Sequence, residues 1–192
     1  VAASTQVVAS TASYAWLYSP TANPTQSGVG AVQARLKFID SAGAATETAA
    51  FTLTSNDVSD AIQKINAISS STGVHASSTG DYKVLLSEKN GNDITIINTS
   101  ARTDLDVKAV GIDGITADST EVSLGAASSS SSVDTAVVRG NLKLSSNNDF
   151  TINQQTAAEF FSNGEQSAPL VNVGTISVLT RIKASDSLAI ID

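Results

Sequence analysis

The chain has 192 residues, of which 41% are apolar and 5% aromatic, and its 18 acidic and 11 basic side chains give a net charge of −7. This balance argues against nucleic acid or an anionic membrane as the partner, because both attract basic patches that displace counterions. The absence of cysteine excludes disulfides and thiolate metal sites. A folded chain of this length buries about 70% of the surface that its unfolded form exposes, so a core of Val, Ile, Leu and Ala is expected.

The sequence contains no methionine and begins with the bland run VAASTQVVAS, which indicates an excised or processed fragment. It shows no secretory signal pattern. No apolar run approaches the roughly 20 residues of a membrane span, so no membrane partner is expected.

The first predicted strand, Ser13–Tyr18, contains the only bulky cluster of residues 1–30. Because large aromatic side chains are usually buried at least in part, a packing patch is the favoured interpretation of Tyr14, Trp16 and Tyr18. The alternative is an exposed aromatic platform on which carbohydrate stacks.

Ala31–Asp40 alternates apolar and polar residues, the pattern of a half-buried strand. Thr46–Thr54 alternates less cleanly and is predicted to pair with it as a hairpin. The residues expected to face the core are Val32, Ala34, Leu36 and Phe38 in the first segment and Ala49, Phe51 and Leu53 in the second.

The periodicity then changes to that of an amphipathic helix, predicted over about residues 56–69. Its apolar stripe consists of Val58, Ala61, Ile62, Ile65 and Ile68. Thr54, Ser55 and Asn56 are candidate N-caps, and Gly73 is expected to terminate the segment. Because so short a helix is unstable alone in water, it should pack across a sheet.

Short β segments dominate the remainder of the chain. They are predicted at Val74–Ser77, Tyr82–Ser87, Ile94–Asn98, Leu105–Val110, Glu121–Leu124, Ala136–Arg139, Gly140–Leu144 and Phe150–Asn153. Asn90–Asp93 is predicted to form a hairpin turn, because Asn-Gly adopts positive φ readily. The other predicted features are a loop at Ser128–Ser132, a helical turn at Thr156–Phe161, an extended segment at Val171–Lys183 and a truncated helix start at Ala184–Asp192.

These elements predict a mainly β, α+β fold, with antiparallel sheets and one amphipathic helix packed on a sheet. Four segments are expected: an N-terminal strand and loop at 1–30, a β-α-β module at 31–99, a β-rich sub-domain at 100–165 and a final segment at 166–192.

The sequence offers no constellation of catalytic or metal-binding residues. The single histidine, His75, is expected to face solvent, and neither a Gly-x-Ser-x-Gly nor a His-Glu-x-x-His pattern occurs. The acidic pairs that could be considered for calcium lack the required loop spacing: Asp104/Asp106 and Asp113/Asp118. Asn98–Ser100 matches a glycosylation sequon but is interpreted as a plain strand end. We therefore expect no enzymatic activity, catalytic residue, metal or cofactor.

One stretch carries a family resemblance. DAIQKINAISSSTGVHAS, at residues 60–77, is similar to the "IN" module of flagellins and hook-associated proteins. In that module a helix ending near Ile-Asn is followed by Thr-Gly-Val-x-Ala and a strand pair. The matching positions are Ile65, Asn66, Thr72, Gly73, Val74 and Ala76.

Two further stretches resemble flagellin. Ala184–Asp192 resembles the start of its C-terminal core helix, and Gly140–Phe161 looks like the last β segment of its outer domain. The resemblance implies the surface-exposed, variable region of a bacterial flagellin, with 31–99 as the IN-type module and 166–192 returning toward the filament core.

The resemblance also implies location and partners. The protein would be an extracellular structural protein of the flagellar filament, involved in motility and exposed as a surface antigen. Its partners would be other flagellin subunits, bound through terminal regions missing from this chain, so that the fragment itself would be monomeric. Val1 and Asp192 should then lie near each other, since both connect to a single rod.

Two alternatives remain open. The first is the same module in a hook-associated or cap protein. The second, of a different class, is a carbohydrate-binding or adhesin domain that uses Tyr14, Trp16 and Tyr18 as its platform.

Overall fold

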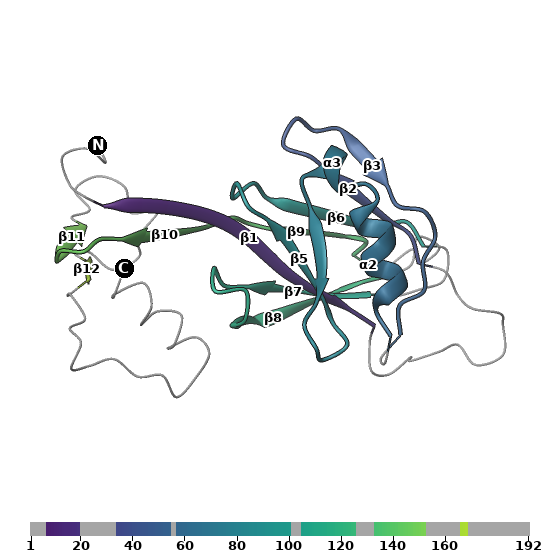
Figure 1. Cartoon of the computed structure of the whole chain (residues 1–192). Coiled ribbons are helices and arrows are strands. Elements are labelled where there is room, and N and C mark those ends of the chain that lie inside the picture. The colour runs from purple at the N-terminus through teal and green to yellow at the C-terminus, as the bar shows by residue number, and fades with distance from the viewer. Residues whose placement is uncertain are drawn as a thin grey trace. The chain divides into compact units, whose positions relative to one another are not determined.

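A computed structural model describes residues 7–19, 34–54, 57–100, 105–125, 133–152 and 166–168. The chain forms two compact units, described separately below: unit 2 is Thr11–Leu142, and unit 1 combines Val1–Ser10 with Lys143–Asp192. The prediction of a mainly β fold with antiparallel sheets is confirmed (Figure 1).

Unit 2 is built on two sheets. The first, six-stranded, has the order β4-β5-β1-β7-β8, with β10 also paired to β1. Its strands are β1 (Val8–Tyr18), β4 (His75–Ser78), β5 (Val84–Glu88), β7 (Leu105–Val110), β8 (Ala117–Leu124) and β10 (Asn141–Ser145). The second, four-stranded, has the order β3-β2-β6-β9. Its strands are β2 (Leu36–Ile39), β3 (Ala45–Glu47), β6 (Ile94–Asn98) and β9 (Thr135–Val138).

The core receives alternate residues from both sheets. Ala15 and Leu17 of β1 are fully buried, as are Leu36 and Phe38 of β2. The hairpin of β2 with β3 forms as predicted. Ala49, however, is exposed, and Thr48 is buried instead, because its hydroxyl accepts a hydrogen bond from the Leu36 N–H at 3.1 Å.

The predicted helix is shorter and divided: α2 spans Ser59–Asn66 and α3 spans Ser69–Thr72. The apolar stripe is confirmed, since Val58, Ala61 and Ile65 are buried in the core and Ile62 and Ile68 pack partly buried against it. α2 has its main contacts with β4.

The cap of α2 also differs from the prediction. Val58 occupies the N-cap position without a side-chain hydrogen bond. The Ser59 N–H instead donates to the Asp57 carboxylate, 2.9 Å away, and this bond together with one from the Ser59 hydroxyl lowers the pKa of Asp57. Of the predicted caps, Thr54 accepts a bond from the Asp57 N–H, and Ser55 and Asn56 lie outside the described residues.

The predicted hairpin at Asn90–Asp93 is wrong. β5 pairs with β4 and β1 in the first sheet, whereas β6 pairs with β2 and β9 in the second. Gly91 has the expected positive φ of 77°, but the turn transfers the chain from one sheet to the other. We call residues 88–93 the crossover.

The strands of unit 2 do not follow the predicted boundary between residues 99 and 100. β7 and β8 complete the sheet that contains β4 and β5, and β9 completes the sheet that contains β2 and β6. The compact units therefore divide the chain differently from the four predicted segments.

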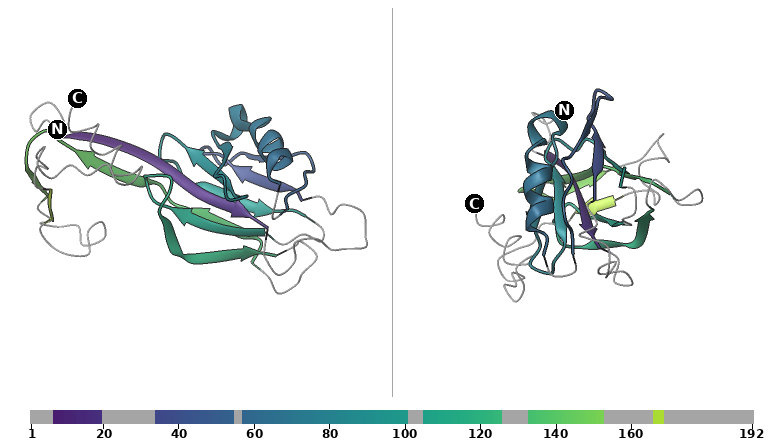
Figure 2. Two further views of the ribbon diagram at one scale, coloured as in Figure 1. Left: turned by 60° about the horizontal axis from the view of Figure 1, so that its bottom comes forward. Right: turned by 90° about the vertical axis from the view of Figure 1, so that its right-hand side faces the viewer.

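In unit 1, β11 (Phe150–Ile152) pairs antiparallel with β12 (Gln166–Ala168). Elsewhere in unit 1, the Ser145 hydroxyl donates to the Val8 carbonyl at 3.5 Å. Figure 2 shows β1 in purple and β10 in green, side by side with opposite arrowheads. The predicted features at Ser128–Ser132, Thr156–Phe161, Val171–Lys183 and Ala184–Asp192, and both chain ends, lie outside the described residues.

Candidate functional site

The six positions that carry the family resemblance meet at one junction between α2, α3 and β4, which we call the helix–strand junction. Asn66, the last residue of α2, makes two hydrogen bonds to the backbone of Ala76 in β4. Its Nδ2 donates to the Ala76 carbonyl at 2.9 Å, and its Oδ1 accepts from the Ala76 N–H at 2.8 Å. The amide side chain thus extends the β ladder beyond the edge strand β4, and satisfies two backbone groups that would otherwise need another partner.

The other motif positions shape the same turn. Gly73 ends α3 in the left-handed conformation, with φ of 74°, which L side chains adopt only with strain. The Thr72 hydroxyl donates to the Ile68 carbonyl and accepts from the Val74 N–H, each at 3.2 Å. Ile65 and Val74 are buried in the core. Each motif residue therefore has a structural role, and none presents a reactive group.

The aromatic cluster predicted from the sequence lies on the face of the first sheet that points away from the core. Tyr14, Trp16 and Tyr18 alternate with buried Ala15 and Leu17 along β1, and all three are partly exposed. We call this row the outer aromatic face. It is neither a buried packing patch nor fully exposed.

Charged side chains contact the outer aromatic face. The Lys83 ammonium lies 4.5 Å from the centre of the Trp16 ring and 5.9 Å from that of Tyr18, a cation–π arrangement. The Tyr18 hydroxyl donates to the Glu121 carboxylate across β7. Partial burial, and then the bond to Glu121 and the negative charges of Glu121 and Asp106, raise the pKa of Tyr18 well above its usual value.

The remaining candidates from the sequence are dispersed. His75 is exposed, as predicted. Asn98 of the sequon is 1% exposed, and its Nδ2 donates to the Leu124 and Gly125 carbonyls, so it acts as a structural strand end in the folded chain. Asp113 holds the β7–β8 turn by accepting hydrogen bonds from Thr116 and Ile115. Burial acts to raise the pKa of Asp113, but these bonds lower it overall.

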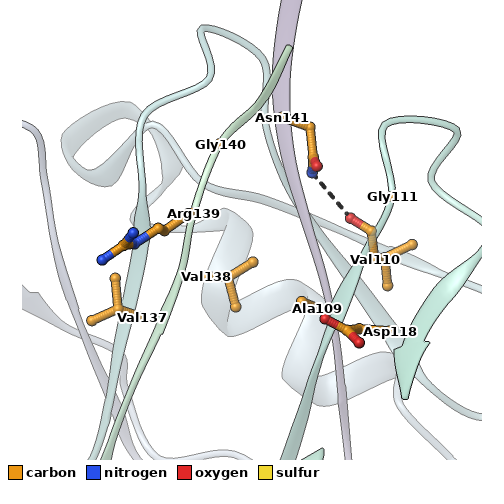
Figure 3. A pocket seen from close by; sticks show the side chains of 9 residues that line it. All are labelled: Ala109, Val110, Gly111, Asp118, Val137, Val138, Arg139, Gly140 and Asn141. Carbon is orange, nitrogen blue, oxygen red and sulfur yellow. Dashed lines mark hydrogen bonds between the residues drawn. The ribbon is translucent and has the colours of Figure 1, made fainter. Parts of the chain in front are cut away.

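A shallow depression of about 470 Å³ lies where β7, β8 and β9 approach the start of β10. Figure 3 shows Arg139, from the β9–β10 connection, and Asp118 of β8 around it. The Asn141 amide donates to the Val110 carbonyl at 3.3 Å. Sequence reasoning did not single out this place. Both charged side chains are exposed, so the depression lacks the enclosed, convergent polar groups typical of a ligand pocket.

Within the described ranges, no three His, Cys, Asp or Glu side chains gather in a way that could hold a metal ion. In the same ranges, no helix has the length and apolarity needed to cross a bilayer.

Comparison with known proteins gives little. No family model matches the chain, and no curated protein matches it. Among solved structures it is similar to the flagellar cap protein FliD D1-D2-D3 domains from Escherichia coli, at 15% identity and a TM-score of 0.34. The match covers 97% of this chain and 56% of that one, so this chain spans about half the length of the FliD chain. A likeness this weak carries no argument about fold or function.

Proposed function

We propose that this chain is the outer, surface-exposed part of a flagellar filament subunit, with a structural rather than a catalytic role. The observation that supports this most is the helix–strand junction. The six residues of the IN-type motif are the ones that build it, through the two Asn66 bonds, the left-handed Gly73 and the Thr72 hydroxyl. The resemblance therefore rests on residues that determine local structure, and not on shared composition.

The path of the chain supports the same proposal. The chain passes into unit 2 along β1 and out along β10, and these two strands pair. A domain carried at the surface of a filament needs such neighbouring connections, because both must lead back to one subunit core. Under this proposal the protein is extracellular, its partners are other flagellin subunits, and no cofactor takes part.

Immunogold electron microscopy tests the proposal. Antibodies raised against the purified chain should label intact cells of the source bacterium along the whole length of the flagellar filament. Cells that lack the gene, and antibody absorbed with the purified chain, serve as controls. Label confined to the filament tip would replace the proposal with a cap protein, and label at the hook–filament junction with a hook-associated protein. Label on the cell body alone would overturn a flagellar role.

A further inference from the structure

We propose that the outer aromatic face binds an uncharged oligosaccharide, as a function additional to the structural role. The face consists of Tyr14, Trp16 and Tyr18 on β1, all partly exposed. Successive outward residues of a strand lie about 7 Å apart, so the rings form a row along which consecutive sugar units could pack. Tyr and Trp suit such a ligand because each combines a broad apolar ring with a hydrogen-bonding group.

The charges around the row favour a neutral ligand. In the register of the sheet, Lys108 lies directly opposite Trp16, and Asp106 opposite Tyr18. Two further charged groups contact the row. The Lys83 ammonium lies over the Trp16 ring, and the Glu121 carboxylate accepts a bond from the Tyr18 hydroxyl.

Two cations and two anions therefore lie around the row, and of these Asp106 is buried and accepts a bond from the Ser123 hydroxyl. A charged polymer would meet a repelling group of its own sign, whereas sugar hydroxyls both donate and accept hydrogen bonds and complement ammonium and carboxylate alike.

One polar atom of the row lacks a hydrogen-bond partner among the described residues. The Trp16 Nε1 is buried and makes no hydrogen bond within the part of the chain that the structure describes. Lys83, whose ammonium lies over the same ring, has a long and flexible stem. A sugar that displaces the ammonium would uncover the ring face for packing.

The β7–β8 turn bounds the row at its Tyr14 end. A Cβ on Gly114 would lie 3.8 Å from the Tyr14 ring and 3.9 Å from Leu85. The turn is held by Asp113, which accepts bonds from the Thr116 N–H at 2.8 Å and the Ile115 N–H at 2.9 Å. The turn thus holds the Tyr14 ring in place before any ligand arrives, which lowers the entropic cost of ordering that ring on binding.

The outer face of the second sheet provides a matched comparison. There Ile97 of β6 lies opposite Lys37 and Thr135 in the register. That face presents aliphatic side chains without a row of aromatic rings, so Ile97→Ala is the control variant for the outer aromatic face.

Isothermal titration calorimetry on the whole chain tests the proposal with cellohexaose, mannohexaose and chitohexaose as neutral probes and hexagalacturonic acid as the acidic one. Because Trp16 is the only tryptophan, its fluorescence should also change when a neutral probe binds. Tyr18→Ala should weaken binding about tenfold or more, as expected for loss of an aromatic contact. Trp16→Phe keeps a smaller aromatic ring and should weaken binding less, whereas Ile97→Ala should leave it unchanged.

Two results would overturn the proposal: no heat and no fluorescence change with any neutral probe up to millimolar concentration, or binding of the acidic probe alone. Equal binding by the folded Tyr18→Ala variant and the wild-type chain would also refute it, and this variant remains informative if Trp16→Phe fails to fold. Immunogold labelling does not depend on sugar binding, so the two proposals fail separately.

Discussion

The helix–strand junction and the crossover are both tight connections centred on a glycine with positive φ, Gly73 at 74° and Gly91 at 77°. They differ in where their partners lie along the chain. At the junction, Asn66 binds Ala76, ten residues away. At the crossover, the Thr11 hydroxyl donates to the Asn90 carbonyl at 2.9 Å across a separation of 79 residues. Similar turn residues therefore close a local motif in one place and join two sheets in the other.

The crossover is fixed from several directions. The buried Glu88 carboxylate accepts bonds from the backbone N–H groups of Asn90 and Asn92 and from the Asn90 side chain. The Ser13 hydroxyl donates to the Asn92 carbonyl at 2.5 Å. These contacts come from β1 and β5, which are strands of the first sheet. They therefore direct the segment after the crossover toward the second sheet.

The largest predicted effect is at the point where the β9–β10 connection passes over the crossover. A Cβ on Gly140 would lie 2.0 Å from the Gly91 carbonyl oxygen, which is backbone and cannot turn aside. Gly140→Ala should therefore lower the free energy of unfolding by about 3 kcal/mol, the upper range for overpacking. Urea unfolding followed by circular dichroism measures the change.

Gly43→Ala is the control, because an added Cβ there meets nothing within 4 Å and only the positive φ is strained. It should lower the free energy of unfolding by about 1 kcal/mol. Equal losses for the two variants would mean that the contact between Gly140 and Gly91 does not hold the crossover.

The second prediction concerns the carboxylate inside the crossover. Glu88→Gln replaces one accepting oxygen with an NH₂ group that faces backbone donors, so the free energy of unfolding should fall by about 2 kcal/mol. Glu47→Gln, an exposed glutamate bonded to the Thr99 hydroxyl, should change it by less than about 0.5 kcal/mol. Thermal unfolding of both variants distinguishes the effects. No loss of stability in Glu88→Gln would show that the crossover does not depend on this side chain.

The third prediction tests the junction. Asn66→Ala removes both bonds to the Ala76 backbone and should lower the free energy of unfolding by about 2 kcal/mol. Gln63→Ala, an exposed position on the same helix, should be nearly neutral. Hydrogen exchange should show faster exchange at the Ala76 amide in Asn66→Ala and not in Gln63→Ala. An unchanged exchange rate at the Ala76 amide in Asn66→Ala would mean that Asn66 does not hold the helix to β4.

The smallest predicted effect is at the start of α2. The pKa of Asp57 is lowered in the folded chain by the backbone and hydroxyl bonds from Ser59. A lowered folded-state pKa gives stability that is present above the usual pKa of Asp and is lost as the pH falls below it. Asp57→Asn should therefore lower the free energy of unfolding slightly at neutral and alkaline pH, and its difference from the wild-type chain should disappear as the pH falls below the usual pKa of Asp. Unfolding curves measured from acid to neutral pH check this, and a difference that stays as large at acid pH as at neutral pH would contradict this origin.

The sequence by itself determined the local structure. Alternation placed Leu36 and Phe38 in the core, the helical stripe placed Ala61 and Ile65 there, and Gly73 marked the end of the helical segment. These features depend on side-chain period and on backbone conformation within a few residues, which are properties that a sequence displays directly.

Only the tertiary structure decided which strands pair. Asn90–Asp93 has the composition of a hairpin turn, yet β5 and β6 belong to different sheets, because Thr11, Ser13 and Gly140 constrain that turn from positions that a local pattern cannot reveal. The same holds for the outer aromatic face. Its three aromatic residues were visible in the sequence as a cluster on one predicted strand, but Lys83, which directly precedes β5, and Glu121 of β8 lie 65 and 103 residues beyond Tyr18 in the chain. They reach the row because β5 and β7 pair with β1, and β8 pairs with β7.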